Sequence, residues 1–401
     1  MKERNGLRRF PLEIWFSVIC QLKDDGRALK ACSLTCKEWR IAARPHLWRS
    51  LNLIKCDGLR GSRRLRIFLE EHSDLAELVH TLSVSLHHSE VSLLSVFINL
   101  TRLAWRHETK YPKDPRNHAD IIIISSVTTL VLRFDECPSL QRFERLLSSF
   151  PRLSYLDVST SLSLLGAGLM HRQIRREEPP KSPLILLHLR KLQFHSADLL
   201  QSLPRITRSS GTSLTHLFLE VDEMYWIPLG DLQHILDLSQ NIRLVELETR
   251  MGRFDPWIEG WGVYLAASLS QITPSHTSLR RVVLHVMSPE HRASWPETLA
   301  YWSDPGQLLG QELSRVLDEL PAVTVVIRQV WSCSESFAQE THESLSHHLL
   351  WRFPALGDHS RRLRFVWNLQ PSRSSAVGDL RISIHDVPLI RNVASGPDQG
   401  R

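Results

Sequence analysis

The chain has 401 residues, of which 42% are hydrophobic, enough to bury a sizeable core as two domains or as one small domain followed by a solenoid. Its 49 basic residues exceed its 43 acidic residues by only six charges. An obligate nucleic-acid-binding protein normally concentrates basic charge on one face, so we expect no nucleic-acid partner.

The cysteines and the apolar runs indicate a compartment. There is no Cys-x-x-Cys pair, and Cys20, Cys32 and Cys36 fall within predicted helices, where they serve as small apolar residues in a reducing environment. The apolar runs are too short to span a membrane, and the charged N-terminus is not followed by a signal-like apolar run. We therefore expect a soluble intracellular protein, in the cytoplasm and/or the nucleus, with no membrane partner.

Apolar residues in positions 10–53 recur at the spacing of two helices. Residues 24–26 should break the chain between the helices, and Arg44-Pro45 should end the second, because a residue before proline is disfavoured in the helical conformation. A helical hairpin of about forty residues buries too little surface to stand alone, so it should need a partner. The two apolar stripes are Leu12, Trp15, Ile19 and Leu22, then Leu29, Cys32, Cys36, Trp39 and Ala43.

The same stretch resembles an F-box of the type common in mushroom-forming fungi. The resemblance is carried, in the expected order, by residues 11–15 (PLEIW), 32–40 (CSLTCKEWR) and 43–48 (ARPHLW), although Phe10 stands where the family usually has leucine. It implies a small helical domain that docks on a Skp-type adaptor and, through it, on the cullin scaffold of a ubiquitin ligase. The alternative is an ordinary helical cap on the following domain. The adaptor-binding residues implied by the resemblance are Pro11, Leu12, Ile14, Leu34, Trp39 and Trp48.

Beyond residue 78 an apolar L-x-x-L-x-L phrase recurs at steps of 21 to 36 residues, with helical candidates between the copies. Such self-similarity is typical of a leucine-rich-repeat array, with one strand and one helix in each unit. The middle positions of the phrases are Leu82, Leu103, Leu130, Leu156, Leu192, Leu217, Leu247 and Val282, with weaker copies centred on Val325 and Val366. The predicted helices are Ser139–Phe150, Leu232–Ser239, Leu265–Ile272 and Leu308–Leu320.

We therefore predict an α+β chain in which a small all-α F-box hairpin is followed by an α/β leucine-rich-repeat-like solenoid. A non-repeating α/β domain is the alternative, because the repeats are irregular and lack the asparagine ladder of the regular family. Residues 106–120 and 171–183 are polar or charged and contain proline, so they should form surface insertions. The expected boundaries are 1–53 for the F-box, 54–78 for a helical linker, 79–370 for the solenoid, 371–393 for a terminal strand and 394–401 for a disordered tail.

The residues do not form a recognisable catalytic or metal-binding motif. His342-Glu343 precedes His347 by one residue too many for the H-E-x-x-H zinc pattern, and the adjacent pairs His87-His88 and His347-His348 should point to different sides. A Gly-rich phosphate loop and a G-x-S-x-G motif are also missing. We expect no enzyme activity, no cofactor and no metal.

Tryptophans concentrate in the C-terminal half and follow three predicted strands, in the loops 220–230, 250–262 and 285–306. Loops that leave the same end of successive strands stack along one edge of a solenoid, where Trp, Tyr and Arg would anchor a partner. The alternative is that these loops fold their tryptophans into local cores. The candidate target-binding residues are Trp226, Trp257, Trp261, Trp295 and Trp302.

Together these features predict a substrate-recognition subunit of a Skp–cullin–F-box-type ubiquitin ligase, with an unknown protein target held by the repeat domain. Two alternatives stay open at this point. The chain could be an F-box scaffold that works outside ubiquitin ligases, or an enzyme built on an α/β scaffold.

Overall fold

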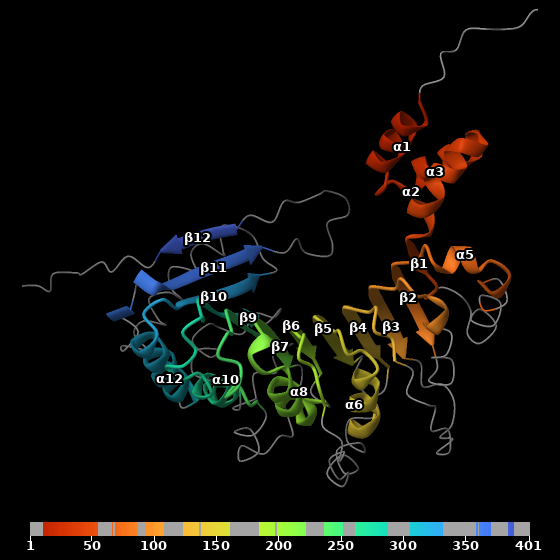
Figure 1. Ribbon diagram of the computed structural model, residues 1–401. Coiled ribbons are helices and arrows are strands. Elements are labelled where there is room, and N and C mark those ends of the chain that lie inside the picture. Colours follow the sequence, from red (N-terminus) through yellow and green to blue (C-terminus); the bar gives the residue numbers. More distant parts are fainter. Residues whose placement is uncertain are drawn as a thin grey trace, which may run out of the picture. The chain divides into compact units, whose positions relative to one another are not determined.

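The computed structural model contains two compact units, each with helices and parallel strands, as the alternation of strand and helix signals predicts (Figure 1). Unit 1 comprises Met1–Glu136 and Ser161–Leu164, and unit 2 comprises Cys137–Thr160 and Leu165–Arg401. The residues that the structure describes are 11–54, 66, 69–86, 94–107, 123–135, 138–160, 184–196, 199–221, 236–251, 261–287, 305–331, 358–359, 361–369 and 384–388.

Unit 1 begins with three helices, α1 (Leu12–Gln21), α2 (Gly26–Thr35) and α3 (Lys37–Trp48). Pro11 precedes α1, where its missing N–H costs no helical hydrogen bond. The Asp25 carboxylate accepts hydrogen bonds from the backbone N–H groups of Arg27 and Ala28, both at 3.0 Å, and so caps α2. The predicted break between the helices is confirmed. It covers residues 22–25, and Gly26 is the first residue of α2.

The predicted second helix of the hairpin is in fact two helices. Cys36 is extended, with φ −155° and ψ 171°, and separates α2 from α3. α3 includes Pro45, at which the sequence predicted its end. Pro45 lies in the last turn, where the buried Ala42 and Ala43 and the packed Leu47 hold the backbone helical against the local preference of proline.

The strands of unit 1 run parallel and in chain order. The middle apolar residues of the phrases face one another, with Leu82 opposite Leu103 and Leu103 opposite Leu130. An unpredicted first strand places Leu51 opposite Leu82, so the strands begin at residue 50 instead of 79, inside the stretch assigned to the hairpin. The elements are β1 (Ser50–Asn52), the short helix α5 (Ser73–Ala76), β2 (Thr81–Leu86), β3 (Arg102–His107) and β4 (Thr129–Phe134).

The strands of unit 2 also follow chain order, parallel from the first to the seventh. The middle positions of the phrases are again register partners on neighbouring strands. In strand order these residues are Leu156, Leu192, Leu217, Leu247, Val282, Val325 and Leu363. The strands are β5 (Tyr155–Thr160), β6 (Lys191–His195), β7 (His216–Val221), β8 (Glu246–Met251), β9 (Arg281–Met287), β10 (Thr324–Trp331) and β11 (Leu363–Leu369).

The last predicted phrase is displaced by three residues. Leu363, not Val366, lies opposite Val325, so Leu363 is the middle position of the last phrase and the first residue of β11. Because strand side chains alternate, an odd separation puts Val366 on the other face, where it is buried with Val283 and Val326. A final strand, β12 (Ile384–Pro388), pairs antiparallel with β11 within the segment predicted to close the array. The tail 394–401 lies outside the described residues.

In unit 2 the helices lie on one face of the strands (Figure 1). Three of them match predicted segments, whereas α8 was not predicted, and residues 236–239, the described part of the predicted helix Leu232–Ser239, are not helical. The predicted insertions 106–120 and 171–183 lie, apart from Arg106 and His107 of β3, outside the described residues. The helices are α6 (Leu140–Ser148), α8 (Leu203–Ser210), α10 (Trp261–Ser270) and α12 (Pro305–Glu319), with short 3-10 turns η2 (Leu200–Ser202) and η3 (Gly211–Ser213) beside α8.

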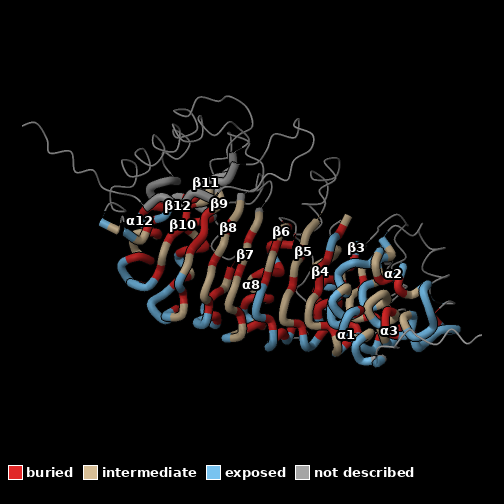
Figure 2. The backbone as a smooth tube through the Cα atoms, turned by 90° about the horizontal axis from the view of Figure 1, so that it is seen from above, coloured by how far each residue is buried: buried red, intermediate tan, exposed pale blue. Residues whose placement is uncertain are grey.

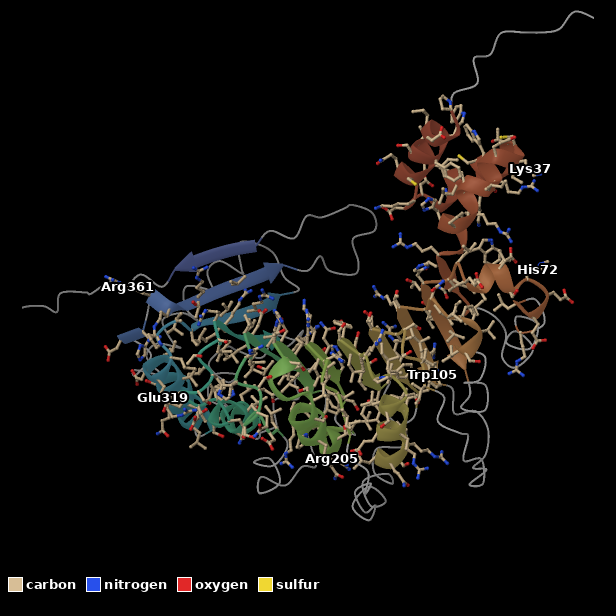
Figure 3. The ribbon with its side chains drawn as sticks, in the orientation of Figure 1. Lys37, His72, Trp105, Arg205, Glu319 and Arg361 are labelled. Atoms are coloured by element: carbon tan, nitrogen blue, oxygen red, sulfur yellow. The ribbon has the colours of Figure 1, made fainter. Side chains whose placement is uncertain are left out.

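The core of each unit follows from the alternation of the strands. Phrase residues such as Leu103, Leu192 and Leu217 are at most 1% exposed, and Figure 2 shows buried residues along the labelled strands. Trp105 on β3, labelled in Figure 3, is 2% exposed and belongs to the core of unit 1. The alternate side chains therefore form a second face of each set of strands, which we call the outer face.

One backbone contact recurs between neighbouring strands. The carbonyl of Arg190 accepts hydrogen bonds from the N–H groups of both Thr215 (2.8 Å) and His216 (3.0 Å). The Thr215 carbonyl accepts in the same way from the N–H groups of Val245 and Glu246, at 2.7 and 3.2 Å. The His80 carbonyl accepts from those of Thr101 and Arg102. The Thr215 hydroxyl adds a third hydrogen bond to the Arg190 carbonyl, at 3.0 Å. This contact fixes the position at which each strand enters the sheet.

The helix ends of unit 2 are satisfied by side chains from the next strand–helix segment. The buried Asn241 donates from Nδ2 to the carbonyls of Thr207 (3.0 Å) and Gly211 (2.7 Å) at the end of α8. Arg315 donates to two carbonyls at the end of α10, each at 2.9 Å, and Arg362 donates to two at the end of α12. Carbonyls that have no partner within a helix are thereby paired between segments.

Candidate functional site

The three N-terminal helices of unit 1 build a small core of their own. Five buried residues form it, and Phe16, Leu22, Trp39 and Leu47 pack around them half-buried. The rings of Trp15 and Trp39 lie 4.6 Å apart between centroids, so Trp39 joins α1 to α3. The buried residues are Ile19, Leu29, Cys32, Ala42 and Ala43.

Each of the three helices also carries apolar side chains that this core does not use. Leu34 is 80% exposed, and Ile14, Val18 and Ile41 are 48%, 45% and 55% exposed. Ile14 and Val18 are four residues apart on α1, which places them on one side of that helix. Exposed aliphatic side chains on several helices of so small a core are typical of a docking surface.

The residues expected to bind an adaptor therefore divide into two groups. Pro11, Ile14 and Leu34 are exposed and available to a partner. Trp39 packs at the edge of the helical core, and Trp48 is half-buried at the end of α3. The side chain of Leu12, the sixth residue, lies outside the described residues.

A column of charged side chains crosses the outer face of unit 2. His195 Nδ1 lies 2.5 Å from Oε2 of Glu220, and Glu220 Oε1 lies 3.3 Å from Nε of Arg250. Glu220 lies opposite Arg250, Arg250 opposite His285, and His285 opposite Arg328. With His195 on β6, each strand from β6 to β10 therefore places one residue in the column. We call these five residues the charged column.

Glu248 lies on β8 two residues before Arg250, on the same outer face, and contacts the other end of the column. Its Oε1 contacts Nε2 of His285 and lies 3.5 Å from a guanidinium nitrogen of Arg328. The Phe218 ring lies between the two imidazoles, with centroid distances of 5.0 Å to His195 and 6.3 Å to His285. The contacts described for these imidazoles are with carboxylates and with this ring, an arrangement that cross-links strands.

The carboxylates of this network remain ionised. Burial by itself would raise the pKa of Glu220, but the His195 hydrogen bond and the charge of Arg250 outweigh it and hold the pKa below its ordinary value. Burial likewise acts to raise the pKa of Glu248, and the His285 hydrogen bond and nearby cations lower it overall. Both carboxylates are therefore already paired within the chain.

Four of the five tryptophans predicted to bind a target, Trp226, Trp257, Trp295 and Trp302, lie outside the described residues. Trp261 is the first residue of α10, so it belongs to a helix and not to the predicted loop 250–262. The helix extends four residues further towards the N-terminus than Leu265, where the apolar pattern predicted it to begin. The target-binding surface of tryptophans therefore stays a prediction.

The charged column was not predicted from the sequence, although its signal is simple. The column residue follows the third apolar position of each phrase by one residue, as Glu220 follows Leu219 and Arg250 follows Thr249. The residues at this position of the successive phrases are His195, Glu220, Arg250, His285 and Arg328.

No protein-family model matches the chain, and a comparison with curated proteins finds no match. In the described ranges no helix is long and apolar enough to cross a membrane. Those same ranges also lack any group of three or more His, Cys, Asp or Glu side chains placed to hold a metal ion.

Proposed function

We propose that the chain is a substrate-recognition subunit of a Skp–cullin–F-box-type ubiquitin ligase. In this proposal α1–α3 form an F-box that docks on a Skp-type adaptor, and the strand–helix segments form an irregular leucine-rich-repeat-like solenoid that holds a protein target. The function is positional. The chain holds a target lysine near a conjugating enzyme that carries ubiquitin, and this proximity raises the effective concentration of the lysine. The chain itself forms no covalent bond.

The observation that carries the proposal is the exposure of Leu34 and Ile14 on helices whose own core is complete without them. Both are residues that the F-box resemblance assigns to the adaptor. The proposal draws further support from the register of the strands, because one apolar phrase per strand with its middle residues opposite one another is the pattern of a repeat array.

The test is co-purification of the full chain with a Skp-type adaptor. Leu34→Asp and Ile14→Asp place charges on exposed positions, so they should leave the melting temperature nearly unchanged while they abolish adaptor capture. Leu187→Asp is the matched control, because Leu187 is a leucine of unit 2 that is 66% exposed. This variant should bind the adaptor like the wild type. Wild-type strength of capture by Leu34→Asp, or no capture by the wild type, would contradict the proposal.

A second measurement separates the ligase from a scaffold that acts outside it. The purified complex of chain and adaptor is mixed with a cullin and resolved by size-exclusion chromatography. A ternary complex is the result expected for a ligase subunit. Capture of the adaptor without the cullin would instead favour the scaffold.

A further inference from the structure

Three exposed arginines share the outer face of unit 1. Arg102 and Arg106 lie on β3 and Arg133 lies on β4, all at alternate positions to the buried phrase residues. Arg106 and Arg133 are directly opposite in the parallel register. We call these three residues the arginine face.

This arrangement is unfavourable for the isolated chain. Like charges directly opposite on neighbouring strands destabilise the pair. Asp135, the residue that follows β4, pairs with Arg106 at 3.2 Å. Among the described residues no ion pair is formed by Arg102 or Arg133. The arginine face therefore differs from the charged column of unit 2, whose carboxylates and cations already satisfy one another.

The side chains between the arginines are short, and Val131 on β4, opposite Ala104, is buried. Ala104 separates the two arginines on β3, and Thr129 lies opposite Arg102 on β4. β2 adds Thr81, Ser83 and Ser85 on the same outer face. A backbone in extended conformation can approach such a surface closely, since no bulky side chain stands between the guanidinium groups. The aromatic side chains Trp105 and Phe134 of these strands are buried on the other face.

We propose that the arginine face binds an extended acidic segment of a partner protein through aspartate or glutamate carboxylates. Arg102 and Arg106 are four residues apart on one strand, about 13 Å at roughly 3.3 Å per residue, so one phosphate group cannot bridge them. In an extended peptide, acidic residues four positions apart project to one side at the same spacing of about 13 Å, and a peptide with acids at alternate positions contains such pairs. Arginine forks pair with carboxylates through two hydrogen bonds, which suits this partner.

The alternative polyanion, single-stranded nucleic acid, fits less well. Such ligands are held by a basic groove together with aromatic rings on which bases stack. The described outer-face residues of β2, β3 and β4 include no aromatic ring. That the acidic segment belongs to a ubiquitination target rests on the proposed function, whereas its binding to the arginine face does not.

The experiment measures fluorescence anisotropy of a labelled peptide of alternating glutamate and serine, titrated with the full chain without any adaptor. Binding should weaken as salt is added. The double variant R102Q/R133Q should bind at least tenfold more weakly. The matched control is the R142Q variant, which should bind the peptide like the wild type, because Arg142 is an exposed arginine on helix α6 of unit 2 and not part of the arginine face. All three positions are exposed, so equal thermal melting curves verify folding.

Charge reversal gives the proposal a positive readout. The variant R102E/R133E should lose the glutamate peptide and gain binding to a peptide of alternating lysine and serine. Adaptor capture by R102Q/R133Q should stay at wild-type strength, which separates this inference from adaptor docking. Three results would overturn it: undiminished binding by R102Q/R133Q, equal binding of a glutamine–serine peptide, or displacement by a single-stranded oligonucleotide at lower concentration than by unlabelled peptide.

Discussion

His195 on β6 and Glu220 on β7 are joined by a contact of 2.5 Å between Nδ1 and Oε2 on the outer face of unit 2. The Glu220 side chain is 14% exposed, so solvent screens this contact less than it would a surface ion pair. The contact ties two strands whose sequence separation is long. It also gives the stability of unit 2 a defined dependence on pH.

The first prediction follows from the lowered pKa of Glu220. A carboxylate whose pKa is lower in the folded than in the unfolded chain stabilises the fold above the unfolded pKa, near 4.5, and this contribution disappears as the pH falls through the folded pKa. Wild-type chain should therefore lose more unfolding free energy between pH 5.5 and pH 3.5 than Glu220→Gln does. Urea unfolding at the two pH values measures this difference.

The control for this prediction is Glu70→Gln, at an exposed position of unit 1 outside the charged column. Its pH dependence should equal that of the wild type. An identical slope for Glu220→Gln and wild type would show that the His195 contact does not persist in solution.

The second prediction concerns a pair of asparagines with the same kind of hydrogen bond. Asn241 is fully buried and satisfies carbonyls at the end of α8, so Asn241→Ala leaves buried groups unpaired and should cost about 1–3 kcal/mol of unfolding free energy. Asn99 donates to the Glu77 carbonyl at 2.8 Å from an exposed position, where water replaces it. Asn99→Ala should therefore change the free energy by less than about 0.5 kcal/mol. Equal losses in denaturant unfolding would contradict the structural difference.

The third prediction sets two glycines against each other. Gly211 after α8 has φ +53° and ψ −138°, a backbone conformation that side chains disfavour, so Gly211→Ala should destabilise by about 1–3 kcal/mol. Gly26 opens α2 with free space where an alanine Cβ would lie and without positive φ, so Gly26→Ala should stabilise by about 0.4–1 kcal/mol. Thermal melting of the two variants should move in opposite directions. Gly211 also has free space, so a loss there reports backbone strain alone.

The sequence predicted most strands because one local signal controls them. Each strand needs an apolar residue that is buried in the core at the middle position of its phrase. Leu156, Leu192 and Leu217 fill this position in three successive strands. The first strand was missed because its phrase, Trp48-x-x-Leu51-x-Leu53, begins inside α3. The last phrase was misplaced because several apolar residues of β11 fit the spacing, and only pairing with β10 selects Leu363.

The helical break at Cys36 and the continuation through Pro45 depend on packing that periodicity does not encode. For the candidate site, the sequence could name Leu34 and Trp39 but could not say which is exposed, because both fit an apolar stripe or a motif. The arginine face needed the register of β3 and β4, since Arg106 and Arg133 are distant in the chain and become neighbours only when the strands pair. Long-range register is the information that a single sequence lacks.

The contact between one carbonyl and two amides has a consequence for how such a chain changes over generations. It spans 21 residues between His80 and Thr101, 27 between Thr101 and Thr128, and 25 between Arg190 and Thr215, with the same hydrogen bonds each time. The strand entry points are thus independent of the amount of chain that separates them. Insertions and deletions between strands can accumulate freely, and a lineage can diversify its surface segments while it inherits one unchanged scaffold.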